Sequence, residues 1–190
     1  MRAKTLHDLS SSFVAKVNTS LGRALPVALT ILADAVSSVQ ADMSYELEEQ
    51  LGSVLVPSDM EATTKQLVDG TAGPVAVMEK ENGEKVRAAV EEGRAAAIKM
   101  LQRDMDQIAE CSDGLEPIVS LELITPEELE NKMNVVLGEA MKDAHKRLDG
   151  VASENDFASM QEWLDGESAQ MRVPIREKRE AAVAERERLE

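Results

Sequence analysis

The side chains best suited to metal chemistry are few in this sequence. Only two histidines occur, His7 and His145, and neither has the spacing of a zinc site or of a di-iron Glu-x-x-His motif. Asp104 and Asp106 begin like a calcium-binding loop, but the pattern fails at Ile108, where the loop needs other residue types. We therefore predict no metal site and no cofactor.

Candidate nucleophiles and phosphate-binding loops are equally weak. Ser53 follows a glycine but lacks the second glycine of a nucleophile elbow, and no predicted strand precedes it. Residues 70–74 contain two glycines without the Lys-Ser/Thr pair that a P-loop needs. Paired acids such as Glu127 and Glu128 are typical of solvated helix faces. We predict no catalytic residue and expect a protein that is not an enzyme.

Cys111 is the single cysteine, so no disulfide can form within the chain. A lone cysteine on a predicted helix is usually a small buried hydrophobic residue. This composition fits a reducing compartment, and the cytoplasm is the compartment we expect.

The composition predicts an all-α fold. Hydrophobic residues make up 43% of the 190 residues and aromatic residues only 2%, while ten methionines are present. Such an aliphatic core suits a multi-helix bundle better than a β-sandwich, whose strands favour β-branched and aromatic residues. We expect a bundle with a long central helix and a projecting, charged C-terminal helix.

The charge is strongly negative but uneven. A net charge of −15 argues against nucleic acid as a partner, because such binding needs a basic face. The N-terminal region nevertheless carries Arg2, Lys4, Lys16 and Arg23. Two interpretations are open: a weak contact of these bases with an anionic surface, or folding of this helix onto the acidic body of its own chain. The second is the one we favour.

No stretch of the sequence reaches the ~20 apolar residues that span a bilayer, so we expect no transmembrane segment. The basic, serine-rich residues 1–23 loosely resemble a mitochondrial transit peptide, which makes mitochondrial import the alternative. We favour a retained helix.

Apolar periodicity and capping signals divide the chain into helices. Residues 1–166 are expected to form the bundle, and residues 167–190 a charged helical extension. The expected helices of the bundle cover residues 3–21, 26–55, 59–69, 84–111, 126–149 and 154–165. The apolar stretch 115–124 is expected to be an extended connector, with pairing to another chain as the alternative.

The stretch Leu25–Leu55 has the clearest apolar seam, with steps of three and four residues. Its first half is apolar around most of its circumference, which predicts the core of the bundle. Its second half has a single stripe beside acidic residues. We predict that this stripe contacts a partner protein through Met43, Leu47, Leu51 and Leu55.

The C-terminal segment has a thin apolar stripe among alternating acids and bases. A helix this short and polar is marginal alone in water, so it either frays or docks on a partner. The residues expected to dock are Ile175, Val183 and Leu189.

Two functions remain open, with a third less favoured. The first is a structural or assembly protein, a helical subunit of a homo-oligomer or larger particle such as a virion. The alternative is a monomeric regulatory or adaptor bundle that binds a partner's amphipathic helix, for which adaptable methionine side chains are well suited. A ligand carrier with a pocket inside the bundle is the third.

Overall fold

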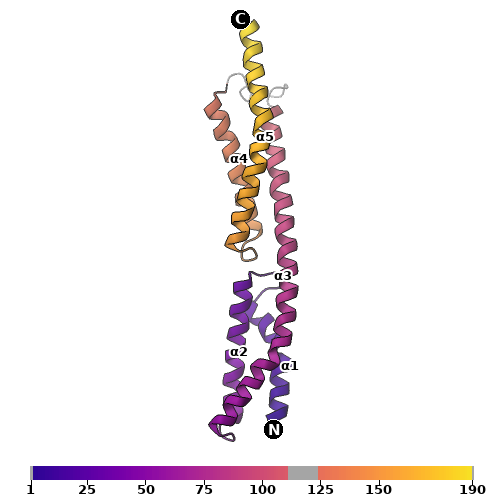
Figure 1. The fold of residues 1–190 in the computed structure, drawn as a ribbon, viewed down its shortest axis with the longest axis vertical. Helices are drawn as coiled ribbons and strands as arrows, with labels where there is room; N and C mark the ends of the chain where they lie inside the picture. Colours follow the sequence, from indigo (N-terminus) through magenta and orange to yellow (C-terminus); the bar gives the residue numbers. More distant parts are fainter. Residues whose placement is uncertain (1, 111–123, 190) are drawn as a thin grey trace. The chain divides into compact units, whose positions relative to one another are not determined.

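The computed structural model describes residues 2–110 and 124–189. Five helices account for most of these residues, so the predicted all-α class is confirmed. They are α1 (Arg2–Leu21), α2 (Leu29–Leu51), α3 (Pro57–Glu110), α4 (Pro126–Arg147) and α5 (Glu154–Leu189). Figure 1 shows their order along the chain. The extended connector predicted at 115–124 and the predicted burial of Cys111 fall outside the described residues, except for Ile124.

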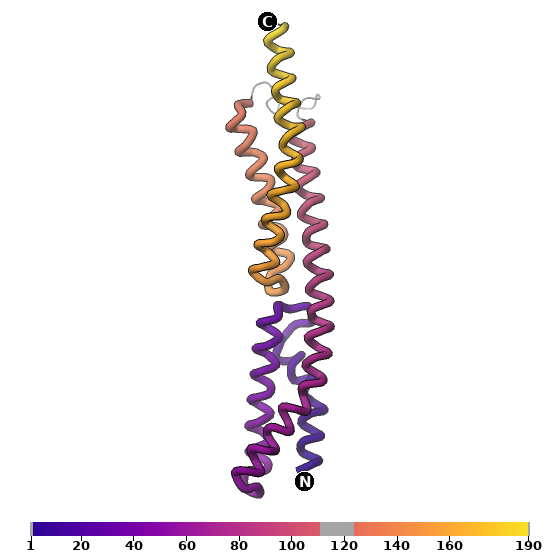
Figure 2. Tube along the Cα trace, in the orientation of Figure 1, coloured from indigo at the N-terminus to yellow at the C-terminus, as the bar shows by residue number. Residues whose placement is uncertain are grey.

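The chain divides into two compact units, and α3 contributes to both. The first unit comprises Met1–Ala89 with the turn Gly150–Ser153, and the second comprises Val90–Asp149 with Glu154–Glu190. Within the first unit, α1, α2 and the first part of α3 lie alongside one another (Figure 1). Within the second unit, α4 and α5 lie beside the later part of α3 (Figure 2).

The core of the first unit is built from one stripe on each helix. Phe13 and Val17 of α1 are fully buried, as are Met43 and Leu47 of α2. In α2 the buried residues recur at steps of three and four, which keeps them on one face of a helix. The buried set of this unit also includes Leu9, Val27, Leu32, Ala35, Val36, Val39, Leu51, Leu67 and Met78.

Helix α2 begins at Leu29, three residues later than the sequence predicts. The reason is that both backbone polar groups of Val27 bond to the side chain of Asn82. The Val27 N–H donates to the side-chain carbonyl of Asn82, and the Val27 C=O accepts from the side-chain nitrogen of Asn82. Ala28 then has an extended conformation, with ψ of 143°. The helix ends at Leu51, also earlier than the predicted Leu55.

Helix α3 shows the largest difference between the predicted and the observed helices. The expected helices 59–69 and 84–111 are parts of one helix of 54 residues, which continues through Pro74 and through the Asn82-Gly83 pair. Pro74 lacks the N–H that would bond Gly70, and proline inside a helix bends it. A bend is visible in the part of α3 that lies beside α2 (Figure 2). A long helix is therefore present, but it is α3 and not the stretch Leu25–Leu55.

The start of α4 is predicted correctly in detail. The side-chain oxygen of Thr125 accepts from the N–H of Glu128, and the Glu128 carboxylate accepts from the N–H of Thr125, at 2.9 Å. This reciprocal pair is a capping box. The pKa of the Glu128 carboxyl is lowered because its ionised form accepts from the Thr125 N–H and from the Thr125 hydroxyl. Ile124 and Leu129, which flank the box, are both buried, as a hydrophobic staple requires.

Helix α5 is longer than predicted, because it runs without a break from Glu154 through Pro174 to Leu189. The sequence-based division between residues 166 and 167 therefore falls inside a continuous helix. Ile175 is buried in the second unit, and the bases around it bond to α4. The first turns of the predicted extension thus pack against their own chain.

Candidate functional site

A groove lies between α2 and the first part of α3 in the first unit. It is an open groove of about 1000 Å³. Helix α2 lines it with Ala41, Ser44, Tyr45 and Glu48, and the α2–α3 connection adds Gly52 and Leu55. The α3 side consists of Pro57, Met60, Glu61, Thr64, Lys65, Val68 and Asp69.

The two helices present matching rows of residues to this groove, called the α2–α3 groove below. The row on the α2 side is Ala41, Tyr45, Glu48 and Gly52, the last being the C-cap residue of α2; on α3 the row is Pro57, Glu61, Thr64 and Val68. Both rows follow the spacing i, i+4, i+7 and i+11, which places residues on one face of a helix. The groove is therefore a channel about three helical turns long.

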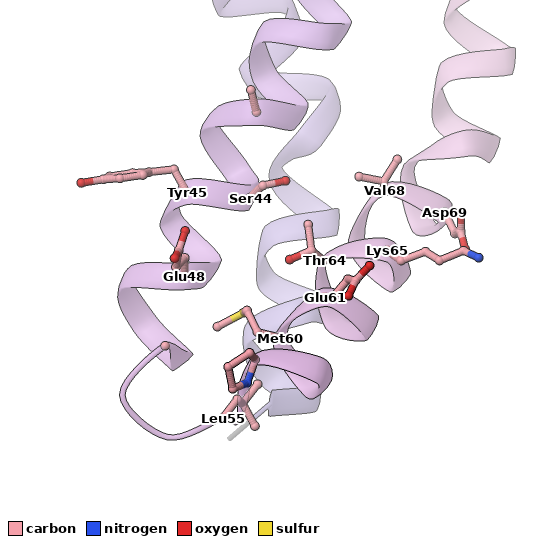
Figure 3. Close-up of a pocket in the computed structure, with 13 residues that line it drawn as sticks. Ser44, Tyr45, Glu48, Leu55, Met60, Glu61, Thr64, Lys65, Val68 and Asp69 are labelled. Atoms are coloured by element: carbon pink, nitrogen blue, oxygen red, sulfur yellow. The ribbon is translucent and has the colours of Figure 1, made fainter.

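The apolar side chains of the groove are only partly covered by the rest of the unit. Met60 and Leu55 are half-buried and lie at the same end of the groove (Figure 3). Val68 is 38% exposed and Tyr45 is 64% exposed. In Figure 3 the Tyr45 ring points away from α3, so it lies on the rim and not on the floor.

The charged side chains of the groove are mostly acidic. Glu48 comes from α2, while Glu61 and Asp69 come from α3, and Lys65 is the one base among the lining residues. Lys65 and Asp69 lie next to each other at one edge (Figure 3). Carboxylates at an exposed edge attract cationic groups, and salt weakens this attraction.

Two shallower depressions lie between α1 and α2, on either side of an ion pair. The Lys16 ammonium lies 2.5 Å from the Glu46 carboxylate, and both residues line both depressions. The lining also includes hydroxyl side chains, and those of Ser12 and Thr19 donate to backbone carbonyls of their own helix. These depressions are small, at about 440 and 480 Å³.

The structure corrects the exposure predicted for the second half of α2. Met43, Leu47 and Leu51 are at most 1% exposed, because α1 and α3 cover them. The first half also contributes to the core, as predicted, through Leu32, Val36 and Val39, although Leu29 within it is 61% exposed. Met43, Leu47 and Leu51 are thus part of the intramolecular core, and of the four predicted contact residues on this stretch only Leu55 lines the groove.

The three residues predicted to dock on the C-terminal segment have different environments. Ile175 is buried, Val183 is half-buried and Leu189 is 76% exposed. Arg172 and Arg176 flank Ile175 and both bond to the Glu130 carboxylate of α4, at 3.1 and 2.5 Å. The hydrogen bond from Arg176, assisted by the charges of both arginines, lowers the pKa of Glu130.

The N-terminal bases mostly contact their own unit. Arg2 donates to the side chain of Gln66, and Arg23 donates to the carbonyl of Gly150. With the ion pair of Lys16, three of the four bases have intramolecular partners, while Lys4 is exposed at one of the small depressions. These contacts favour the interpretation that this helix folds onto its own chain.

Within residues 2–110 and 124–189, no three histidine, cysteine or acidic side chains come together in a group that could hold a metal ion. None of the helices described combines the length and apolar content needed to cross a membrane. Comparison with protein-family models, with curated proteins and with solved structures finds no match.

The groove residues were not identified from the sequence, although a signal for them existed. The spacing of Ala41, Tyr45, Glu48 and Gly52 is helical, but the row mixes small, aromatic and acidic side chains. Such a row does not stand out as apolar. What makes it a groove is its position opposite the row on α3, and that pairing depends on how the helices pack.

Proposed function

We propose that this protein is a non-enzymatic interaction protein that binds an amphipathic helix of a partner protein. The observation that carries the proposal is the α2–α3 groove, whose two helical rows leave room for a third helix. Helix-in-groove recognition uses such a surface, with apolar anchors of the partner inserted between two helices. Met60 suits this role because methionine adapts its shape to different partners.

The chemistry of the groove favours binding over catalysis. Acid–base catalysis by two carboxylates needs unlike environments that separate their pKa values. Glu48 and Glu61 are both exposed, and the lining includes neither histidine nor cysteine. A reducing compartment remains part of the proposal, on the basis of the single cysteine.

The test is a binding titration with designed helical peptides. We would label a panel of 14-residue amphipathic peptides, with one leucine stripe and lysine, glutamine or glutamate flanks, and measure fluorescence anisotropy. At least one member should bind wild type. Val68→Glu places a charge in the groove and should weaken binding at least tenfold.

The control is Val77→Glu, on the same helix. Val77 is 57% exposed and does not line the groove, so this variant adds the same charge elsewhere. It should bind like wild type. If no peptide of the panel binds wild type, or if both variants lose binding equally, the proposal fails.

A homo-oligomeric assembly subunit is the second candidate. Exposed apolar residues at the α2–α3 connection and at the end of α5 favour it: Val54 and Val56 are more than half exposed, and so is Leu189. Light scattering over a range of concentrations tests this candidate. A strict monomer at high concentration would remove it, whereas a defined oligomer that dissociates in a Val54→Ser, Val56→Ser, Leu189→Ser variant would support it.

A further inference from the structure

We infer that the α2–α3 groove selects a partner helix whose apolar stripe is flanked by lysine or arginine. This inference rests on the proposed function and specifies the chemistry of the partner. It follows from the size of the groove, the nature of its floor and the charges on its two edges.

The size of the groove fixes the length of the occupant. The first and last residues of each row are eleven positions apart, and a helix rises ~1.5 Å per residue, so the channel is roughly 17 Å long. A partner helix of about twelve residues fills that length. Such a helix presents three or four apolar side chains along one face.

The floor of the groove suits close packing of a helix. Ala41 and Gly52 have small or no side chains, so the backbone of an incoming helix can approach α2 near both ends of its row. Met60 and Leu55 provide a half-buried apolar surface at one end of the groove. Burial of this surface by a partner is favourable by roughly 25 cal/mol per Å² of apolar area.

The two edges of the groove supply the selectivity. Glu48 lies on the α2 side and Glu61 on the α3 side, so an acid stands on each flank of the channel (Figure 3). Asp69 adds a third acid, and Lys65 beside it is the only base of the lining. A helix with bases on both flanks meets opposite charge on both sides, whereas an acidic helix meets like charge.

The charge also indicates that the occupant is a different protein and not a second copy. The exposed end of α5 is the segment of this chain best placed to dock on another copy, since Leu189 is exposed there. Its last described turns carry Glu180, Glu185 and Glu187 against Arg186 and Arg188. Helix α1 is more basic, but its apolar face is already buried in its own unit.

Two matched peptides test the inference directly. Both are 14 residues long with the same leucine stripe, and one has lysine at the flanking positions where the other has glutamate. Anisotropy titrations at low salt should show at least tenfold tighter binding of the lysine peptide. The difference should shrink as salt is raised, because the edge charges are exposed to solvent.

A charge reversal at the edges tests whether the groove itself makes the selection. Glu48→Lys combined with Glu61→Lys should remove or invert the preference. The control is Glu79→Lys combined with Glu81→Lys, which changes the net charge of the unit equally at exposed positions outside the groove. Circular dichroism would verify that both variants remain helical.

Each outcome assigns failure to a different statement. Equal binding of both peptides overturns the charge selection but leaves helix binding intact. Failure of both peptides, and of every other member of the panel, overturns the proposed function itself. If the control pair lowers the preference as much as the groove pair does, overall charge and not the groove makes the selection, and the inference is wrong.

Discussion

The side-chain amide of Asn82 pairs with the backbone of Val27 through both of its polar ends. The Val27 N–H donates to the Asn82 carbonyl oxygen at 2.9 Å, and the Asn82 nitrogen donates to the Val27 carbonyl at 2.8 Å. Both residues are fully buried. An asparagine in the middle of a long helix thus fixes the extended segment that leads into α2.

Replacement of Asn82 by alanine should destabilise the first unit. The N–H and C=O of Val27 would be left buried without partners, and each unsatisfied group costs about 1–3 kcal/mol. We expect a loss of roughly 2–4 kcal/mol in the free energy of unfolding, partly offset by the better helix propensity of alanine. Urea denaturation followed by circular dichroism measures it.

Asn82→Asp sharpens the test, since it keeps the acceptor for Val27 N–H and removes the donor to Val27 C=O. It should be at least as destabilising as Asn82→Ala at neutral pH, because a buried carboxylate would face a carbonyl oxygen. Glu81→Ala, at the exposed neighbouring position, is the control. Little difference between Asn82→Ala and this control would contradict the assigned role.

Both halves of α2 should respond equally to a buried charge. Leu32 and Leu47 are each at most 1% exposed, so aspartate at either position places an unpaired charge in the core. We expect Leu32→Asp and Leu47→Asp both to unfold the first unit at room temperature, seen as loss of far-ultraviolet ellipticity. A folded Leu47→Asp protein with altered association would instead restore the partner contact predicted from the sequence.

Gly93 should not tolerate alanine, although the substitution improves helix propensity. A Cβ atom there would lie 2.8 Å from one methyl carbon of Leu148 and 3.2 Å from its Cγ, and Leu148 is itself buried. Overpacking costs about 1–3 kcal/mol, against a gain of about 1 kcal/mol in propensity. Gly93→Ala should therefore lower the melting temperature or leave it unchanged.

Gly138→Ala is the matched control for this prediction. Gly138 is exposed within α4, and a Cβ there meets no atom within 4 Å. This variant should raise stability by about 0.5–1 kcal/mol. Equal stabilisation by both variants would mean that Leu148 moves aside without cost.

The contacts of Glu130 should make the second unit sensitive to acid. Its pKa is lowered in the folded chain, so its contribution is present above the unfolded pKa of roughly 4.3 and is lost as the pH falls through the folded pKa. Since 33% of the Glu130 side chain is exposed, we expect its ion pairs to contribute at most about 1 kcal/mol to the free energy of unfolding.

Glu130→Gln tests this sign. Its deficit in unfolding free energy relative to wild type should be largest near neutral pH and should vanish in acid. Glu139→Gln, exposed on the same helix, should show no such pH dependence. A deficit for Glu130→Gln that stays constant down to strong acid would disprove the electrostatic origin.

Features encoded by a few adjacent residues were predictable from the sequence. The Thr125–Glu128 capping box needs only four residues in a row, and the backbone geometry follows from them. The glycines that follow α1 and α4 were predictable in the same way. Gly22 and Gly150 both have positive φ, which glycine adopts readily at the end of a helix.

Features decided by packing were not predictable in the same way. Pro74 and Asn82-Gly83 are local signals for a helix break, yet α3 continues through both of them. The face that includes Leu67, Thr71, Met78 and Asn82 is buried, so continuing the helix retains this packing. Likewise, nothing in the second half of α2 reveals that α1 and α3 would cover its single apolar stripe.

Because α3 belongs to both units, its backbone also couples the folding of one unit to that of the other. If the unit that ends at Ala89 unfolded alone, the remaining part of α3 would need a new helix start near Val90. That start would leave four N–H groups without helical acceptors, and the sequence Ala89-Val90-Glu91 supplies no capping residue before them. The shared helix thus adds a free-energy penalty to the state in which only the first unit is unfolded, and it favours cooperative unfolding of the two units.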